Sequence, residues 1–175
     1  MTQATHYDSR TIRLHWISAV LIAAMWLLAQ LIDDFPREVR VYARSTHIIM
    51  GVGLVLILAA RLFWRNTGGR QLPAAKQGPL NLLAKGTHYL LYAIVLMTLA
   101  CGIGYTFLRG DNILNLFRLP KLFADVADLR DNMGDLHALG ANSLMILAGI
   151  HAAAALFHHY VWKDGVLRRM LPARG

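Results

Sequence analysis

Residues 136–157 read LHALGANSLMILAGIHAAAALF, and this stretch decides the fold. It is apolar along most of its length, yet it carries His137 and, fourteen residues later, His151. Because a helix turns about 100° and rises about 1.5 Å per residue, the two histidines fall within roughly 40° of one face and about 21 Å apart along the axis. One helix therefore offers two ligand side chains on one face, near opposite surfaces of a bilayer.

The composition indicates an integral membrane protein. Of the 175 residues, 56% are hydrophobic and 16% are charged, whereas a soluble domain has about a quarter charged residues. Four apolar stretches are each near the length that crosses a hydrocarbon core of about 30 Å: residues 17–32, 48–63, 89–107 and 139–161. Four such runs in so short a chain disfavour the alternative, buried helices of a soluble protein. We predict one all-α domain over residues 1–175, an integral membrane four-helix bundle with helices at about 10–32, 44–65, 80–107 and 134–163.

The first apolar stretch is expected to be retained as a span. Arg10 and Arg13 precede it, as in a signal peptide, but it is long for one, and Gln30 and Asp33 make a poor cleavage site. The single cysteine, Cys101, allows no disulfide within the chain, and no Cys-x-x-Cys-His motif is present for covalent haem attachment. Any haem must therefore be held by axial ligands and packing.

The net charge of +8 is distributed asymmetrically. Eleven Lys and Arg residues and two Asp residues lie in the two termini, in the 64–88 connection and at Arg61. The other connections carry seven Lys and Arg residues and eight acidic residues. The excess of Lys and Arg predicts that both termini lie in the cytoplasm. This topology explains the basic charge, so we expect membrane lipid and no nucleic acid as a partner.

The predicted topology places four histidines at two depths. The first helix runs outward and the second and fourth run inward, so His15 and His151 share the cytoplasmic level, and His47 and His137 share the outer level. Depth alone then pairs His15 with His151 and His47 with His137. Facing helices of a bundle can place two imidazoles on opposite faces of a flat macrocycle. The pattern thus predicts two haem b groups, one at each level.

Packing contacts and zinc binding account for the histidines less well. A single histidine within a span is often a hydrogen-bonding contact between helices, but four at two matching depths are harder to explain in this way. Zinc usually requires four ligands together, often with Cys or carboxylate. Gly51 and Gly53 near His47, and the alanines after His151, leave room for a planar group, although the same residues serve close helix packing.

Three further residues are candidates for contacts with a quinone or a haem propionate: Lys76, His158 and Arg10. His158 follows His151 by seven residues, which places it within roughly 20° of the same face and about 10 Å nearer the cytoplasm. Each of the three also fits a simple role as a residue at the membrane surface. His88, at the start of the third helix, is expected to be a packing or quinone-side residue and not a fifth iron ligand.

The sequence resembles the bacterial cytochrome b561 family of small four-helix, dihaem membrane proteins. The resemblance covers nearly the whole chain and includes Leu14-His15-Trp16, Thr46-His47 before Gly51, and Leu136-His137. Its most specific part is the run from His151 through His158-His159-Tyr160 and Lys163-Asp164 to Leu171-Pro172. By resemblance, the four paired histidines match the family's axial ligands, in a bacterial inner membrane.

The resemblance also implies an activity. The family includes superoxide oxidases, which take an electron from superoxide outside and pass it through both haems to ubiquinone near the cytoplasm. This implies a quinone site near the inner haem, with Lys76 and His158 as matching candidates, and an outer site for an anion. Basic residues available to attract that anion are Arg37, Arg40, Arg44, Arg109, Arg118 and Lys121. The alternatives are a non-catalytic cytochrome b subunit that relays electrons between quinone and a separate redox partner, and a metal-binding or transport protein without haem.

Overall fold

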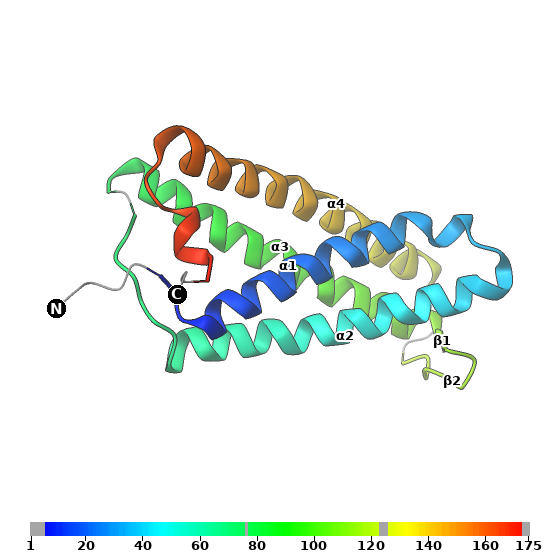
Figure 1. The fold of residues 1–175 in the computed structure, drawn as a ribbon. Coiled ribbons are helices and arrows are strands. Elements are labelled where there is room, and N and C mark those ends of the chain that lie inside the picture. Colours follow the sequence, from blue (N-terminus) through cyan, green and yellow to red (C-terminus); the bar gives the residue numbers. More distant parts are fainter. Residues whose placement is uncertain (1–5, 76, 123–125, 173–175) are drawn as a thin grey trace.

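The computed structural model describes residues 6–75, 77–122 and 126–172, and four long helices dominate this part of the chain (Figure 1). They are α1 (Ser9–Leu31), α2 (Arg37–Thr67), α3 (Pro79–Arg109) and α4 (Ala127–Phe157). Each is long and apolar enough to cross a membrane, with a mean hydropathy between 1.6 and 2.0 in its most apolar window. The predicted four-helix membrane bundle is confirmed.

The connections contain short elements. A 3-10 turn, η1 (Ile32–Asp34), joins α1 to α2, and two short antiparallel strands, β1 (Asn112–Ile113) and β2 (Phe117–Arg118), follow α3. Helix α4 continues into a π-helical turn, η2 (His158–Trp162), and the chain then forms a 3-10 turn, η3 (Leu167–Met170).

Helices α2 and α4 begin earlier than the apolar pattern predicts. Pro36 precedes the first residue of α2, and its ring restricts the backbone φ angle at the start of the helix. Polar turns extend both helices beyond the apolar stretches, because a helix can continue into water once its hydrogen bonds are made. As a result, His47 and His137 lie well inside their helices instead of at the starts.

The four helices form two closely packed pairs. Helix α1 packs along α2 and α3 packs along α4, whereas the two pairs make few contacts with each other. We call this sparse boundary the seam. A flat group that lies between ligands from opposite pairs would occupy the seam.

The buried apolar core lies midway along the bundle and draws side chains from all four helices. In sequence, the α2, α3 and α4 members fall between the two predicted histidine levels. Elsewhere many large apolar side chains face outward, as a surface in contact with lipid requires. We call the core cluster the apolar layer; its members are Met25, Leu54, Leu58, Val95 and Leu144.

The two ends of the bundle differ. The described N-terminal and C-terminal segments meet at one end, here called the terminal end, and β1 and β2 lie at the other, the hairpin end (Figure 1). At the terminal end the Tyr7 amide donates to the Arg169 carbonyl at 3.0 Å. At the hairpin end the Leu114 amide donates to the Oγ of fully buried Ser45 at 2.8 Å, which ties the hairpin to α2.

Candidate functional site

The structure brings His47 and His137 together across the seam. His47 comes from α2 and His137 from α4, and their ring centres lie 6.0 Å apart with an angle of 77° between the ring planes. Metal–imidazole bonds of about 2 Å on both sides of one metal ion place two ring centres roughly 6 Å apart. His47 and His137, the hairpin-end pair, are therefore spaced as two imidazoles that would hold one metal ion between them.

The remaining two helices orient the same rings through backbone carbonyl groups. The Nδ1 of His47 lies 3.2 Å from the carbonyl oxygen of Met25 in α1, and the Nδ1 of His137 lies 2.8 Å from that of Thr98 in α3. A carbonyl only accepts, so each neutral ring carries its hydrogen on Nδ1 and keeps a lone pair on Nε2. Metal-binding histidines in proteins are held in this way.

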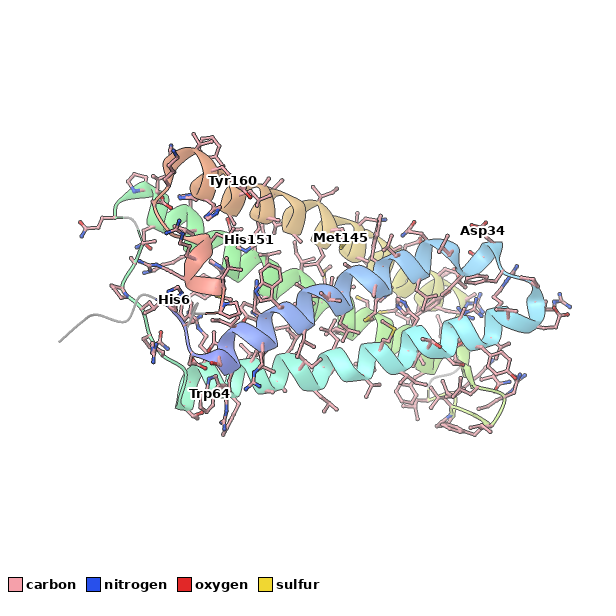
Figure 2. All side chains as sticks on the ribbon, in the orientation of Figure 1. His6, Asp34, Trp64, Met145, His151 and Tyr160 are labelled. Carbon is pink, nitrogen blue, oxygen red and sulfur yellow. The ribbon has the colours of Figure 1, made fainter. Side chains whose placement is uncertain are left out.

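Three histidines gather nearer the terminal end. His151 of α4 has its ring centre 5.3 Å from that of His88 of α3. His15 of α1 also lies near these two rings. Figure 2 shows His151 in the half of α4 that lies toward His6 and Trp64. We call His15, His88 and His151 the terminal-end cluster.

Sequence reasoning missed one residue here, Arg61. Its guanidinium, from α2, donates to the Ser18 Oγ at 2.6 Å and to the His15 Nδ1 at 3.3 Å. It also lies over the Tyr92 ring, 5.6 Å from the ring centre. The signal was present in the sequence, because Arg61 interrupts an apolar run and a charged residue inside a span is a functional candidate by default. From the sequence alone, Arg61 counts only among the Lys and Arg residues that predict the membrane topology.

At the hairpin end, the arrangement of the described residues fits one planar cofactor in the seam. His47 and His137 come from opposite helix pairs and lie at a spacing that suits two ligands of one metal ion, and a Cβ added to Gly53 would meet nothing within 4 Å. Among the described residues no three His, Cys, Asp or Glu side chains are grouped to hold one metal ion. Two facing imidazoles are what an iron porphyrin requires from the protein, since the porphyrin supplies the other ligands.

The remaining predicted contact residues occupy different surroundings. His158 lies in η2, where its Nδ1 is 2.6 Å from the Asp164 Oδ2 and its ring packs against Trp162. Arg10 is exposed and stacks on the Trp64 ring at 4.6 Å. Lys76 lies outside the described residues.

The basic residues of the hairpin end are partly engaged within the protein. Arg109 pairs with Asp111 at 3.2 Å, and Arg40 donates to the carbonyls of Asp33 and Phe35. Burial raises the pKa of Asp111 above its ordinary value, although the charges of Arg109 and Arg44 lower it. Two of the predicted anion-attracting residues, Arg37 and Arg118, are exposed.

Four apolar helices with histidines facing across a seam are the features of a membrane-embedded cytochrome of the b type. The family model of prokaryotic cytochrome b561 matches residues 6–173. The chain belongs to this family, and it is therefore a multi-pass bacterial membrane protein of electron transfer for which the family implies b-type haem.

Similar proteins cover almost the whole chain. A Yersinia pestis protein named "Probable superoxide oxidase CybB" is 29% identical over 96% of this chain and 97% of its own length. The Escherichia coli protein "Cytochrome b561 homolog 2" is 29% identical over 90% of this chain and 86% of its own. "Cytochrome b562" of Cereibacter sphaeroides is 27% identical over 99% of this chain and 100% of its own.

Proposed function

We propose that this chain is a dihaem cytochrome b that carries electrons from periplasmic superoxide, through two haems, to ubiquinone near the cytoplasm. The observation that carries the proposal is the His47–His137 pair, whose ring centres lie 6.0 Å apart across the seam with both Nδ1 atoms on backbone carbonyls. His15 and His151 are the proposed ligands at the other level. The distribution of Lys and Arg supports a cytoplasmic terminal end and a periplasmic hairpin end.

The protein's part in electron transfer is to hold two redox centres apart in a dry medium. Haem bound by these residues would supply single-electron transfer. The apolar layer between the two histidine levels excludes water and keeps the dielectric constant low. At the hairpin-end level, His47 and His137 would fix the orientation of the macrocycle, because their rings are held by backbone carbonyl groups of neighbouring helices.

Superoxide oxidation would occur at the hairpin end. Two superoxide anions each lose one electron and leave as O2, so this end needs positive charge and no proton transfer. The exposed guanidinium groups of Arg37 and Arg118 provide charge that attracts an anion. The name of the Yersinia pestis relative supports this choice of substrate.

Quinone reduction would occur at the terminal end, where two electrons and two protons convert ubiquinone to ubiquinol. His158 is the candidate proton donor, because its Nδ1 lies 2.6 Å from the Asp164 carboxylate, which orients the ring. Lys76 and Arg10 are the other proposed contacts with the quinone or a propionate. The stacking of Arg10 on Trp64 means that it would have to turn to reach either.

A relay without catalysis of its own is the second candidate. Two of the relatives carry the names of cytochromes without a stated substrate, which favours a subunit that passes electrons between quinone and a separate redox partner. In that case the haems would be present but superoxide would not reduce them.

The test is to mix the purified protein with enzymatically generated superoxide and a short-chain ubiquinone. The expected result is that the haem absorbance spectrum changes to that of the reduced form and that one ubiquinol forms for two superoxide anions. His47→Ala should abolish both, whereas the matched control His159→Ala should keep the haem spectrum. Haems that superoxide fails to reduce would favour the relay, and a protein without haem bands would overturn both candidates.

A further inference from the structure

Arg61 has an unusual set of contacts for a charge inside a span. Its guanidinium donates to Ser18 Oγ at 2.6 Å and lies over Tyr92. Ser18 is only 1% exposed, and its hydroxyl in turn donates to the His15 carbonyl at 2.8 Å. These contacts hold the guanidinium between α1, α2 and α3, next to the terminal-end cluster.

No described Asp or Glu neutralises this charge by an ion pair. A charge within a membrane span is costly unless it pairs with an opposite charge or reaches water. Neutral oxygen and an aromatic ring compensate only part of that cost. An anion that reached the Arg61 guanidinium would therefore stabilise its charge.

The hydrogen bond from Arg61 to His15 is not compatible with iron binding by His15. A guanidinium only donates, so the Nδ1 of His15 must accept and the neutral ring carries its hydrogen on Nε2. An imidazole that binds iron through Nε2 instead carries its hydrogen on Nδ1. The two N–H groups would then face each other, so Arg61 must turn to another acceptor when His15 binds iron.

A pocket opens beside Arg61 toward the terminal end. Its lining includes Arg61, Arg65 and Arg70 with the aromatic side chains of Trp64 and Tyr92. The pocket is adjacent to His15 through Leu14, which also lines it. Three guanidinium groups around aromatic walls suit a carboxylate on an otherwise apolar molecule.

We propose that Arg61 binds a propionate carboxylate of the haem at the terminal-end level, and that it leaves the His15 Nδ1 to do so. This inference rests on the proposed function. Arg61 forms charge-assisted hydrogen bonds with the carboxylate while Ser18 and Tyr92 keep its side chain in place. The positive charge also favours the ferrous state, which carries one electron more, and so raises the midpoint potential of that haem.

The experiment compares Arg61→Gln and Arg61→Lys with Arg13→Gln, because Arg13 is exposed near the same end of the bundle and does not line this pocket. The holoproteins are produced with haem that carries 13C in its propionate carboxyl groups and are purified without added anionic lipid. Redox titration gives the two midpoint potentials, and infrared difference spectra follow the labelled carboxylate bands. Haem dissociation is measured by transfer to an acceptor protein.

In Arg61→Gln we expect one midpoint potential to fall, the labelled bands of the same haem to shift, and that haem to dissociate about ten- to a hundredfold more readily. Arg61→Lys should restore part of each effect, and Arg13→Gln should resemble the natural chain. Unchanged labelled bands, or equal effects of Arg61→Gln and Arg13→Gln, would overturn the inference while leaving two haems in place. If Arg61→Gln is isolated without the second haem, Arg61→Lys takes its place in the test. Unchanged labelled carboxylate bands in Arg61→Lys would then overturn the inference. A natural chain without haem would overturn the proposed function as well.

Discussion

Gly102 of α3 lies directly against the imidazole of His137 of α4. A Cβ at Gly102 would come within 2.8 Å of both Cε1 and Nδ1 of that ring. The Thr98 carbonyl that holds the His137 Nδ1 is one turn earlier in the same helix. The absence of a side chain at Gly102 is therefore what lets the ring reach this carbonyl.

Gly102→Ala should displace His137 and weaken haem binding at the hairpin-end level. We expect the haem content to fall from two per chain toward one, with the haem at the terminal-end level retained, as measured by the haem-to-protein ratio and the redox titration. The matched control is Gly104→Ala, where the added Cβ meets only the Met133 Sδ at an ordinary 3.6 Å. Full haem content in Gly102→Ala would contradict the assigned role of His137.

Single ligand variants should lose one haem each. His47→Ala should remove the haem at the hairpin-end level, and His15→Ala the haem at the terminal-end level, because one axial ligand does not usually replace two. The midpoint potentials of the haems that remain in the two variants should differ, since each variant retains the haem of the other level. Equal loss of both haems in either variant would count against the assignment by depth.

His88 provides the control for these ligand variants at the terminal-end level. Its Nδ1 lies 2.7 Å from the Ala84 carbonyl of its own helix, which leaves Nε2 unprotonated in the neutral ring, and it contacts His151. If it is a packing residue, His88→Ala should keep two haems. If His88→Ala loses a haem that His15→Ala retains, His88 is the ligand in place of His15.

The apolar pattern predicted the four spans because lipid demands apolar surface along the whole length of a helix. It could not give the helix ends, since α2 and α4 continue through polar turns beyond the membrane-spanning stretch. Histidine spacing along α4 predicted two levels because it depends only on helix geometry. The inward direction of Arg61 and the contact of His88 with His151 depend on how the helices rotate against one another, which local sequence does not determine.

The His158–Asp164 pair should matter for quinol formation and not for haem binding. Asp164→Asn keeps a side chain that can accept from the Val166 amide, but it removes the carboxylate charge beside the His158 Nδ1. We expect quinol formation to slow by about a hundredfold or more, with two haems and their reduction by dithionite unchanged. Asp164→Glu should restore part of the rate. An unaltered rate in Asp164→Asn would remove His158 from the proposed proton path.

Asp8 should make the stability of the terminal end depend on pH. Burial alone would raise its pKa, but donors from Thr11, Arg70 and Trp64 outweigh it and hold the pKa of this carboxyl well below its ordinary value. A lowered pKa in the folded state means that the stabilisation is complete above the unfolded value of about 4 and is lost as the pH falls below it.

The measurement for Asp8 is thermal unfolding in detergent. Near pH 7, Asp8→Ala should reduce stability by about 1 kcal/mol, as loss of a helix N-cap does. The difference from the natural chain should narrow below about pH 4. Asp34→Ala, at an exposed position of the hairpin end, is the control. A difference that stays constant down to pH 3 would show that the charge of Asp8 is not what stabilises this end.

Close packing of α3 on α4 should depend on Gly140. A Cβ there would collide with the Thr98 side chain and come within 2.9 Å of the Met97 methyl group. Gly140→Ala should lower stability by about 1–3 kcal/mol, the usual cost of overpacking, and Thr98→Ala in the same chain should recover part of it by removing the hydroxyl. The control is Gly149→Ala on the same helix, where the added Cβ meets nothing within 4 Å. Because the Thr98 carbonyl also holds His137, Gly140→Ala should disturb the haem at the hairpin-end level before the other one, and loss of both haems in parallel would indicate general unfolding instead.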